Sequence, residues 1–248
     1  MLSYQWMVLF YVIVFFISCN VYSIYIHRVW SHRSINIEST ALVYFMRCWL
    51  WFMRFWFPGN STRAFVAGHR KHHATSDTPN DPHSPWYYSK KELFFSPGNV
   101  PGRPYYLTDE EIVKWAGDVP VYDDWLEHQF EKYFVTRYLI EIILTFILFG
   151  VWGPIVHITV ISYLLYHFRF HNYLSHKFGY RHKPSVNADH SQNMFPIGIL
   201  FAGEELAANH HDNPSVPKFS EKWWEFDMSW ATISVLKFFG LIRLNSIK

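Results

Sequence analysis

The sequence predicts an all-α integral membrane protein with about three to four membrane helices and a helical cytoplasmic cap around a two-metal site. We expect a single domain over residues 1–248. Four apolar segments, at about residues 5–26, 41–57, 138–150 and 154–170, alternate with the polar parts 27–40, 58–132 and 171–248. The chain also holds 15 histidines, and several of them directly follow apolar segments. Histidine is the commonest metal ligand in proteins, so this placement predicts a metal site.

The first apolar segment has the length of one membrane span. It runs almost without a polar residue to Ile26, and about 20 residues cross the hydrocarbon of a bilayer as a helix. It has no basic start and no small-residue cleavage site, and it continues directly into His27. We therefore expect a membrane helix and not a signal peptide.

The segment 41–57 is apolar but carries Arg47 and Arg54. Each arginine would cost roughly 2.5 to 3.5 kcal/mol at the centre of a bilayer. We therefore expect an interfacial or re-entrant helix whose arginines face headgroups or water.

The remaining segments predict a hairpin and a short surface helix. Tyr138–Gly150 and Pro154–Phe170 are short and are joined by only three residues, which favours two antiparallel helices. Thr108 and Glu111 have the spacing of a capping box, in which each side chain accepts from the other residue's backbone N–H, so a helix should begin there.

Charge and cysteine usage exclude several classes of function. The net charge is only +2, which gives no reason to expect nucleic acid as a partner. Cys19 and Cys48 lie far apart in apolar stretches, so they form neither a CxxC motif nor a disulfide framework. Two cysteines also exclude a protein-held iron–sulfur cluster of the usual four-cysteine kind.

Four groups of polar residues at the ends of apolar segments are candidate metal ligands. They are His27 with His32; His69 with His72 and His73; Asn172 with His176; and His210 with His211. A smaller group, Asp81-Pro82-His83, follows the second of them. Ligands from four segments suffice for two metal ions, although imidazole alone suits iron, zinc, copper and nickel.

The spacing within two of these groups favours convergence. On a helix His69, His72 and His73 lean toward one face, because residues three and four apart are neighbours. His27 and His32 are five apart, which brings them together if the helix is wound loosely there or ends between them.

Charge and span count place these groups on one side of the membrane. The groups at His27 and His69 share a side only if segment 41–57 does not cross, as its arginines already indicate, and the hairpin returns the chain to that side. Five nearby cations assign it to the cytoplasm by the positive-inside rule. They are Arg28, Arg33, Arg63, Arg70 and Lys71.

The other histidines are interpreted as surface or helix-end side chains. This interpretation covers His128, His157, His167, His171, His182 and His190.

Together these pieces resemble the membrane fatty acid desaturases, specifically the acyl-CoA delta-9 (stearoyl-CoA) type and its short bacterial relatives. The matching stretches follow the same order over nearly the whole chain. They are HRVWSHR from His27, GHRKHHATSDTPNDPHSP from Gly68, NYLSHKFGYR from Asn172, NMFPIGILFAGEEL from Asn193, NHHDNP from Asn209 and KWWEFDMSW from Lys222.

The resemblance implies a di-iron centre that activates O2 and introduces a cis double bond, at delta-9, into a saturated acyl chain. It implies eight histidine ligands, with Asn172 contacting one iron through water. The histidines are His27, His32, His69, His72, His73, His176, His210 and His211. Glu204, Asp81 and Asp189 are candidates for accepting ring N–H bonds from these ligands.

One position departs from the family pattern. The last histidine box of the family reads HNxHH after Gly-Glu and two further residues, whereas this chain has Ala207-Ala208-Asn209-His210-His211. Ala207 stands where a ligand histidine is expected. Three interpretations remain open: a working site with one histidine fewer, an impaired or inactive enzyme, and a rearranged site that recruits His171 or His190.

Two other functions compete with desaturation. The same type of centre serves lipid hydroxylases, and a silent metal-binding membrane protein would tolerate Ala207. The element DPHSP at Asp81 and the pair Asn172 with His176 favour desaturation on the resemblance.

The substrate and the electron source follow from the same resemblance. The acyl chain, carried by CoA, acyl carrier protein or a membrane lipid, should reach the irons through a narrow apolar tunnel. Two electrons per turnover must come from a separate donor such as a ferredoxin, a rubredoxin or cytochrome b5. A basic cluster has two interpretations, a contact for CoA phosphate or an acidic donor, and a solvated positive loop. It consists of Arg63, Arg70, Lys71, Lys90 and Lys91.

Overall fold

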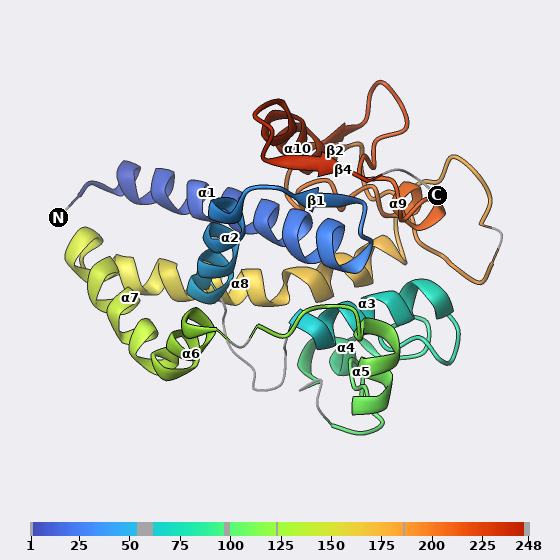
Figure 1. Cartoon of the computed structure of the whole chain (residues 1–248), viewed down its shortest axis with the longest axis horizontal. Helices are drawn as coiled ribbons and strands as arrows, with labels where there is room; N and C mark the ends of the chain where they lie inside the picture. The colour runs from blue at the N-terminus through green and yellow to red at the C-terminus, as the bar shows by residue number, and fades with distance from the viewer. Residues whose placement is uncertain (1, 54–61, 97–99, 123, 186, 246–248) are drawn as a thin grey trace.

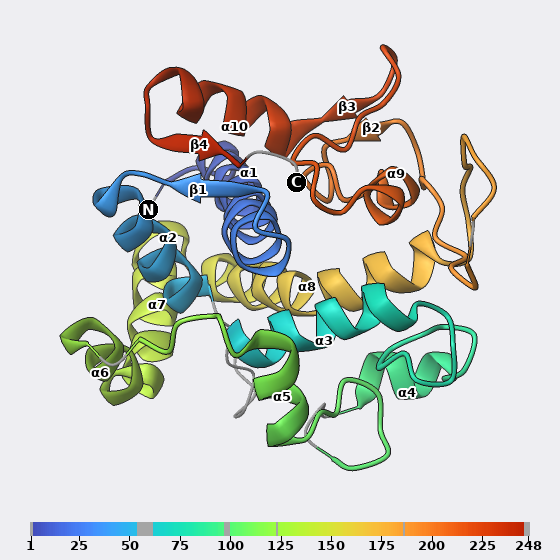
Figure 2. The ribbon, with the colours of Figure 1, turned by 45° about the vertical axis from the view of Figure 1, so that its right-hand side comes forward.

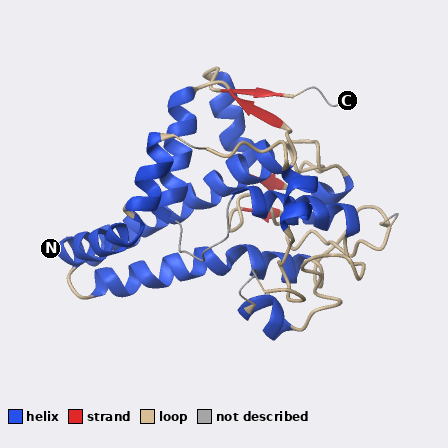
Figure 3. Ribbon diagram, turned by 60° about the horizontal axis from the view of Figure 1, so that its bottom comes forward, coloured by secondary structure: helices blue, strands red, loops and turns tan. Residues whose placement is uncertain are grey.

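The computed structural model describes residues 2–53, 62–96, 100–122, 124–185 and 187–245. Helices dominate the described chain, in agreement with the predicted class (Figure 3). Two long helical rods form its axis: α1 (Tyr4–Val21) with its extension η1 (Tyr22–Ser31), and α8 (Trp152–Ser175).

The two rods lie side by side and run in the same direction. Near their starts the Tyr11 hydroxyl donates to the Gly153 carbonyl over 3.1 Å. Further along, the Cys19 Sγ lies 3.9 Å from the His167 Nε2. Both rods therefore finish toward the same end of the molecule (Figure 1). His32 and His176 directly follow them there.

The extension η1 is a π-helix of ten residues. A π-helix closes i to i+5 hydrogen bonds, so residues five apart come to the same side. The His32 N–H continues this pattern by donating to the His27 carbonyl over 3.1 Å. Of the two arrangements that would bring these histidines together, the loosely wound helix is therefore present.

The predicted hairpin is also confirmed, as α7 (Phe134–Phe149) followed by α8. Gly150 adopts φ 66°, which favours glycine. Gly153 lies so close to α7 that a Cβ would stand 2.0 Å from the Thr145 carbonyl oxygen. The helices extend beyond the predicted segments, and the longer α8 places His176 at its end.

His157 is not a surface residue, contrary to its interpretation from sequence. It is buried between α8 and α7, with its Nε2 3.1 Å from the Glu141 carboxylate. Glu141 also lies 3.3 Å from the Arg137 guanidinium one turn earlier. Buried ionisable groups require partners, and here the partners come from the facing helix.

The second apolar segment forms α2 (Thr40–Met53), and its end from residue 54 on lies outside the described residues, as does Arg54. Arg47 does not face headgroups or water, so that expectation is wrong. It is buried, pairs with Asp124 over 2.7 Å and with Glu127 over 3.3 Å, and stacks on Tyr122. Asp124 caps the start of α6 (Trp125–Lys132) and Glu127 lies in its first turn. The start of α6 thus neutralises an arginine about 80 residues earlier in the sequence.

Three further helices cover the side of α8 that bears the site (Figure 2). They are α3 (Thr62–Thr75), α4 (Lys90–Phe95) and α5 (Asp109–Ala116). The capping box predicted at Thr108 and Glu111 is present at the start of α5. The Arg70 side chain on α3 bonds to Asp118, just after α5, and so fixes α5 against α3.

The C-terminal part folds back over η1 through short strands that the sequence did not indicate. β1 (Ile35–Ile37) pairs antiparallel with β4 (Ile242–Leu244), and β2 (Ile197–Gly198) pairs parallel with β3 (Phe226–Asp227). Between and after them lie the helices α9 (Ala207–Asp212) and α10 (Met228–Phe238).

Arg28 joins this C-terminal part to η1. Its guanidinium is fully buried, bonds to Glu204 over 3.2 Å and Asp227 over 3.0 Å, and stacks 3.7 Å above the Phe219 ring. The charge argument from sequence counted Arg28 among the cations on the cytoplasmic surface, and for Arg28 this is wrong. It was misplaced because its acidic partners come from the far end of the chain.

Among the described residues, one helix is long and apolar enough to cross a membrane, the rod Tyr4–Ser31. Thr40–Met53 and Trp152–Leu164 are apolar but shorter. The count of three to four membrane helices therefore stays a prediction.

We expect Arg28→Met to lower the free energy of unfolding by about 3 to 5 kcal/mol, because Glu204 and Asp227 would keep buried charges without their partner. Chemical unfolding in mild detergent measures this change. The matched control is Arg33→Met, which removes an exposed arginine five residues on, paired with Asp118, and should cost at most about 1 kcal/mol. Equal losses for the two variants would show that Arg28 does not hold the C-terminal part.

Candidate metal centre

All eight histidines predicted as ligands come together at the end of the two rods, in two adjacent groups. The five-histidine group contains His27, His32, His69, His73 and His210. The three-histidine group contains His72, His176 and His211. Within each group the candidate ligand atoms lie within 4.8 Å of one another. The groups are neighbours, with the rings of His73 and His211 4.2 Å apart.

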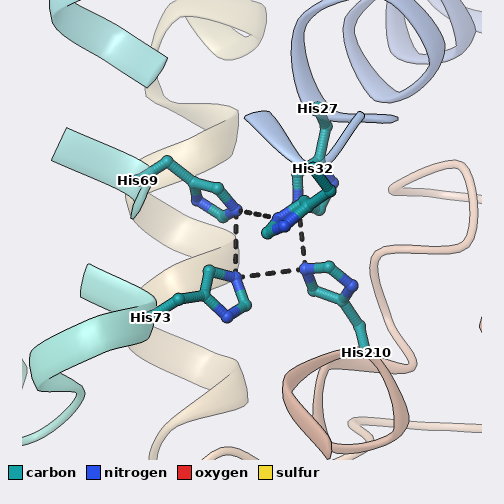
Figure 4. A group of neighbouring side chains, drawn as sticks. All are labelled: His27, His32, His69, His73 and His210. Carbon is teal, nitrogen blue, oxygen red and sulfur yellow. Dashed lines mark hydrogen bonds between the residues drawn. The ribbon is translucent and has the colours of Figure 1, made fainter. Parts of the chain in front are cut away.

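The five-histidine group forms a closed ring of nitrogen atoms. Consecutive Nε2 atoms are 2.8 to 3.1 Å apart around the whole ring. Figure 4 shows the imidazoles pointing their nitrogens toward one another from η1, α3 and α9. Burial is the main cause that lowers the pKa of His69, His73 and His210, and repulsion from the neighbouring histidines adds to it. These imidazoles are therefore neutral.

Hydrogen bonds alone cannot satisfy this ring. In a neutral imidazole each nitrogen is either a donor or an acceptor, so hydrogen-bonded neighbours must alternate in role. Donors and acceptors cannot alternate around a closed ring of five atoms, so at least one contact joins two donors or two acceptors. A cation among them would accept a lone pair from every nitrogen. Nitrogens held about 2.1 Å from one ion at right angles lie about 3 Å apart, which fits the observed spacing.

Adjacent histidines on the same helix belong to different groups. On α3, His69 and His73 join the five-histidine group, whereas His72 joins the three-histidine group. On α9, His210 and His211 divide in the same way. Residues next to each other on a helix point about 100° apart, so two helices placed between the groups serve both. The prediction that the three histidines of α3 share a face holds, but they serve two groups.

Each member of the three-histidine group has its own aspartate, and two of the three aspartates are buried. The Nδ1 of His72 lies 2.9 Å from Asp81, that of His176 2.7 Å from Asp77, and that of His211 3.0 Å from Asp189. A carboxylate at Nδ1 fixes the proton on that nitrogen and leaves Nε2 with a lone pair for a metal. Asp81 and Asp189 were predicted in this role. Asp77 was not, although it lies in the same turn as Asp81.

These aspartates bring negative charge into the site. Burial opposes their ionisation, but the adjacent histidines and hydrogen-bond donors outweigh it and hold the pKa of each below its usual value. Arg181 pairs with Asp189 over 3.0 Å and so compensates one of them. The remaining negative charge favours a cation near the three-histidine group.

Glu204 supports the other group, as predicted. Its carboxylate lies 2.6 Å from the His27 Nδ1 and also bonds to Arg28. Burial opposes ionisation, but His27 and Arg28 prevail and lower the pKa of Glu204 to about 2. The same side chain therefore orients a candidate ligand and joins the C-terminal part to η1.

The position of α9 depends on a buried amide pair that sequence reasoning missed. The Asn193 Nδ2 donates to the Asn209 Oδ1 over 2.9 Å, and the Asn209 backbone N–H donates to the Asn193 Oδ1 over 3.1 Å. Asn209 also donates to Glu225 over 2.9 Å. These bonds hold the segment that carries His210 and His211.

A cavity lies between the two groups and α8. It is lined by Tyr22, His27, His69, His72, His167, Phe168, His171, Asn172, Ser175, His176, Glu204, Ala207, His210 and His211. Asn172 is buried there and donates its amide to the His83 carbonyl over 3.0 Å. The predicted apolar tunnel for a substrate stays a prediction.

Among the histidines not assigned to metal, three more differ from their interpretation from sequence, in addition to His157. His167 is buried in the cavity wall and stacks on Phe201, so it is no surface residue. His171 also lines the cavity and bonds to the Glu204 carbonyl over 2.6 Å. His182 is partly buried and lies 2.7 Å from Glu225. His128 and His190 are exposed, as expected.

His83 was left unassigned by the sequence and is almost fully buried. It stacks between His72, 4.4 Å away, and Tyr105, 5.2 Å away. Among the described residues neither of its ring nitrogens has a hydrogen-bond partner. Its place in the element DPHSP was the only indication available from the sequence.

The fold and the site define a helical protein with a buried centre of eight histidines, suited to two metal ions. Comparison with protein families gives the class more closely. The family model described as fatty acid desaturase matches residues 4–220. The chain therefore belongs to the fatty acid desaturase family.

Several curated relatives cover most of the chain. An sn-1 stearoyl-lipid 9-desaturase of Synechocystis sp. is 28% identical over 88% of this chain and 64% of its own. An sn-2 palmitoyl-lipid 9-desaturase of Nostoc sp. is 33% identical over 72% of this chain and 61% of its own. An acyl-CoA C20 Delta5-desaturase of Anemone leveillei is 25% identical over 96% and 74%. The chain thus spans less than two thirds of the length of the two cyanobacterial relatives.

We expect Asp77→Asn to lower the metal affinity of the three-histidine group by about 10- to 100-fold, because His176 would lose the carboxylate that orients it. Competition between the purified protein and a chelator of known affinity measures the change. The control is Asp118→Asn, since Asp118 pairs with Arg33 and Arg70 and touches none of the eight histidines. An unchanged affinity in Asp77→Asn would exclude the orienting role.

Proposed function

We propose that this chain is an O2-dependent fatty acyl desaturase that introduces a cis double bond, at delta-9, into a saturated acyl chain at a di-iron centre. The single observation that carries the proposal is the convergence of eight histidines in two adjacent groups. The relatives named as 9-desaturases support the reaction and its position.

In this proposal the five-histidine group holds one iron and the three-histidine group holds the other. Asn172 contacts the second iron through a water molecule, as the family resemblance implies. Asp77, Asp81, Asp189 and Glu204 orient the imidazoles and offset the positive charge.

The bound irons supply the oxidising power that no side chain of this protein offers. In the balanced reaction one O2 becomes two waters by taking four electrons, two from the adjacent C–H bonds of the acyl chain and two from an external donor. Two protons enter from solvent. The donor belongs to the class of ferredoxins, rubredoxins or cytochrome b5.

The residues of the chain position the substrate and exclude water. Tyr22 and Phe168 form an aromatic part of the cavity wall, and Phe65 packs against both. An acyl chain has no polar group with which to be oriented, so contact with such apolar walls must fix which carbons are presented.

We propose a membrane location with the site toward the cytoplasm. Besides the rod Tyr4–Ser31, the outer faces of α1 and α7 expose many large apolar side chains. They include Val8, Leu9, Val12 and Ile13 on α1 and Leu139, Ile140, Ile143 and Ile147 on α7. Apolar surface of this extent is rare on water-soluble proteins and suits lipid contact.

Among the possible acyl carriers, we propose a membrane lipid. The basic cluster that would have suited CoA phosphates is largely engaged: Arg63 donates to backbone carbonyls at the end of α5, Arg70 pairs with Asp118, and Lys71 pairs with Glu111. The cyanobacterial relatives are named as lipid desaturases, which agrees with this choice.

Expression with a ferredoxin donor in a host rich in saturated lipids tests the reaction. We expect new delta-9 monounsaturated chains by mass spectrometry, and a loss of at least 100-fold in His73→Ala, because the ring of five nitrogens would be broken. The control His128→Ala changes an exposed histidine on α6 and should leave product within twofold. A hydroxylated chain would indicate the hydroxylase alternative, and no product at all would indicate an inactive protein.

Membranes containing the enzyme and donor, supplied with labelled stearoyl chains, test the carrier. We expect the label presented on a glycerolipid to be desaturated at least tenfold faster than stearoyl-CoA or stearoyl-acyl carrier protein, with lipid synthesis blocked to prevent transfer. Faster conversion of either soluble carrier would contradict a lipid substrate.

A further inference from the structure

Ala207 lines the cavity beside the three-histidine group. It is the first residue of α9 and lies one turn before His211, so the two residues share a face of the helix. Ala207 is 3% exposed, and the same cavity is lined by His72, His176 and His211. A side chain longer than alanine at this position would extend toward the three-histidine group.

The two groups differ in how fully they could surround an ion. The five-histidine group offers five nitrogens in a closed ring, whereas the three-histidine group offers three. The rings of the three are 4.9 to 5.1 Å apart, and the Nδ1 atom of each is taken by an aspartate. Three protein ligands are typical of sites that keep a position for an external ligand, whereas closed sites use four or more.

Neither histidine considered from sequence as a substitute joins the group in the described part of the chain. His171 lines the cavity, but its Nε2 is bound to the Glu204 carbonyl. His190 is exposed and stacks on Trp86, with ring centroids 4.6 Å apart. The space beside Ala207 is instead bordered by polar side chains of α8, among them Asn172 and Ser175.

The charge around the group nevertheless favours retention of a cation. Asp77, Asp81 and Asp189 each contact one of the three imidazoles at its Nδ1 atom, and Arg181 pairs with Asp189. The loss of one neutral ligand at position 207 leaves this charge unchanged.

We infer that the three-histidine group binds its ion with an open coordination position facing Ala207, which a water or a small anion occupies. The ion in this group is therefore the more exchangeable of the two, and it accepts an external ligand that the other ion excludes. This inference rests on the metal centre of the proposed function and concerns only the chain's own residue at position 207.

Cobalt loading of the full chain in detergent tests the inference without measuring activity. The purified protein is stripped of metal, loaded with Co2+, challenged with a chelator, and sampled for metal per chain. We expect two Co2+ per chain, one of which leaves at least tenfold faster than the other. Azide should change only the visible absorption bands that belong to the faster-leaving Co2+.

Ala207→His should slow the fast phase to the rate of the other ion and weaken the response to azide at least tenfold, because only the water held by Asn172 would remain exchangeable. Ala207→Leu is the steric control: it fills the space without a donor atom, so the fast phase should remain. His211→Ala removes a ligand of the three-histidine group and should leave only the slow ion. If Ala207→His fails to fold, the wild-type chain and His211→Ala still decide between the outcomes.

Equal release rates for the two ions in the wild-type chain would overturn the inference, as would an azide response that is as strong in Ala207→His as in the wild-type chain. A different result would overturn the metal centre itself: Co2+ binding unchanged in both His73→Ala and His211→Ala. The two failures are therefore distinguishable.

Discussion

Five imidazole nitrogens in a closed ring impose the main constraint on this structure. They are buried or partly buried, lie 2.8 to 3.1 Å from their neighbours, and cannot satisfy one another because donors and acceptors cannot alternate around a ring of five. A bound cation removes this conflict, and the surrounding fold holds the ring in place. Burying polar atoms without partners costs free energy of folding. The arrangement therefore fits a metal site and does not fit a group that only packs the protein interior.

The backbone meets this constraint at three places. The π-helical turn of η1 brings His27 and His32 to one side, and α8 ends at His176. Helix α3 directs two histidines into the five-histidine group and one into the three-histidine group, whereas α9 directs one into each. Glu204 and Arg28 then fasten the C-terminal part across η1, next to the site. The metal centre and the stability of the fold thus share side chains.

Local pattern predicted much of this structure. The apolar segments predicted α1 and the hairpin, and the histidine groups predicted which imidazoles meet. The spacing of His27 and His32 left two possibilities, a loosely wound helix or a helix end, and the structure has the loosely wound η1. Long-range pairing could not be predicted in the same way. The partners of Arg28 and Arg47 lie about 180 and 80 residues away, and the Asn193–Asn209 pair and the short strands depend on chain reversals without a local pattern. His157 and His167 were misplaced because a histidine alone does not reveal whether a partner faces it.

The division into two groups gives Ala207 a definite meaning. The substitution leaves the five-histidine ring complete and falls on the group that three aspartates support. Retention of metal and ease of ligand access are therefore separate properties in this chain, one set by charge and the other by the side chain at position 207.

Anomalous diffraction at the iron absorption edge, on crystals of protein purified from iron-supplied cells, tests the central claim most directly. The account predicts two iron peaks, one within the ring of His27, His32, His69, His73 and His210 and one beside His72, His176 and His211. A structure with the ring intact and no metal peak within it would contradict the account.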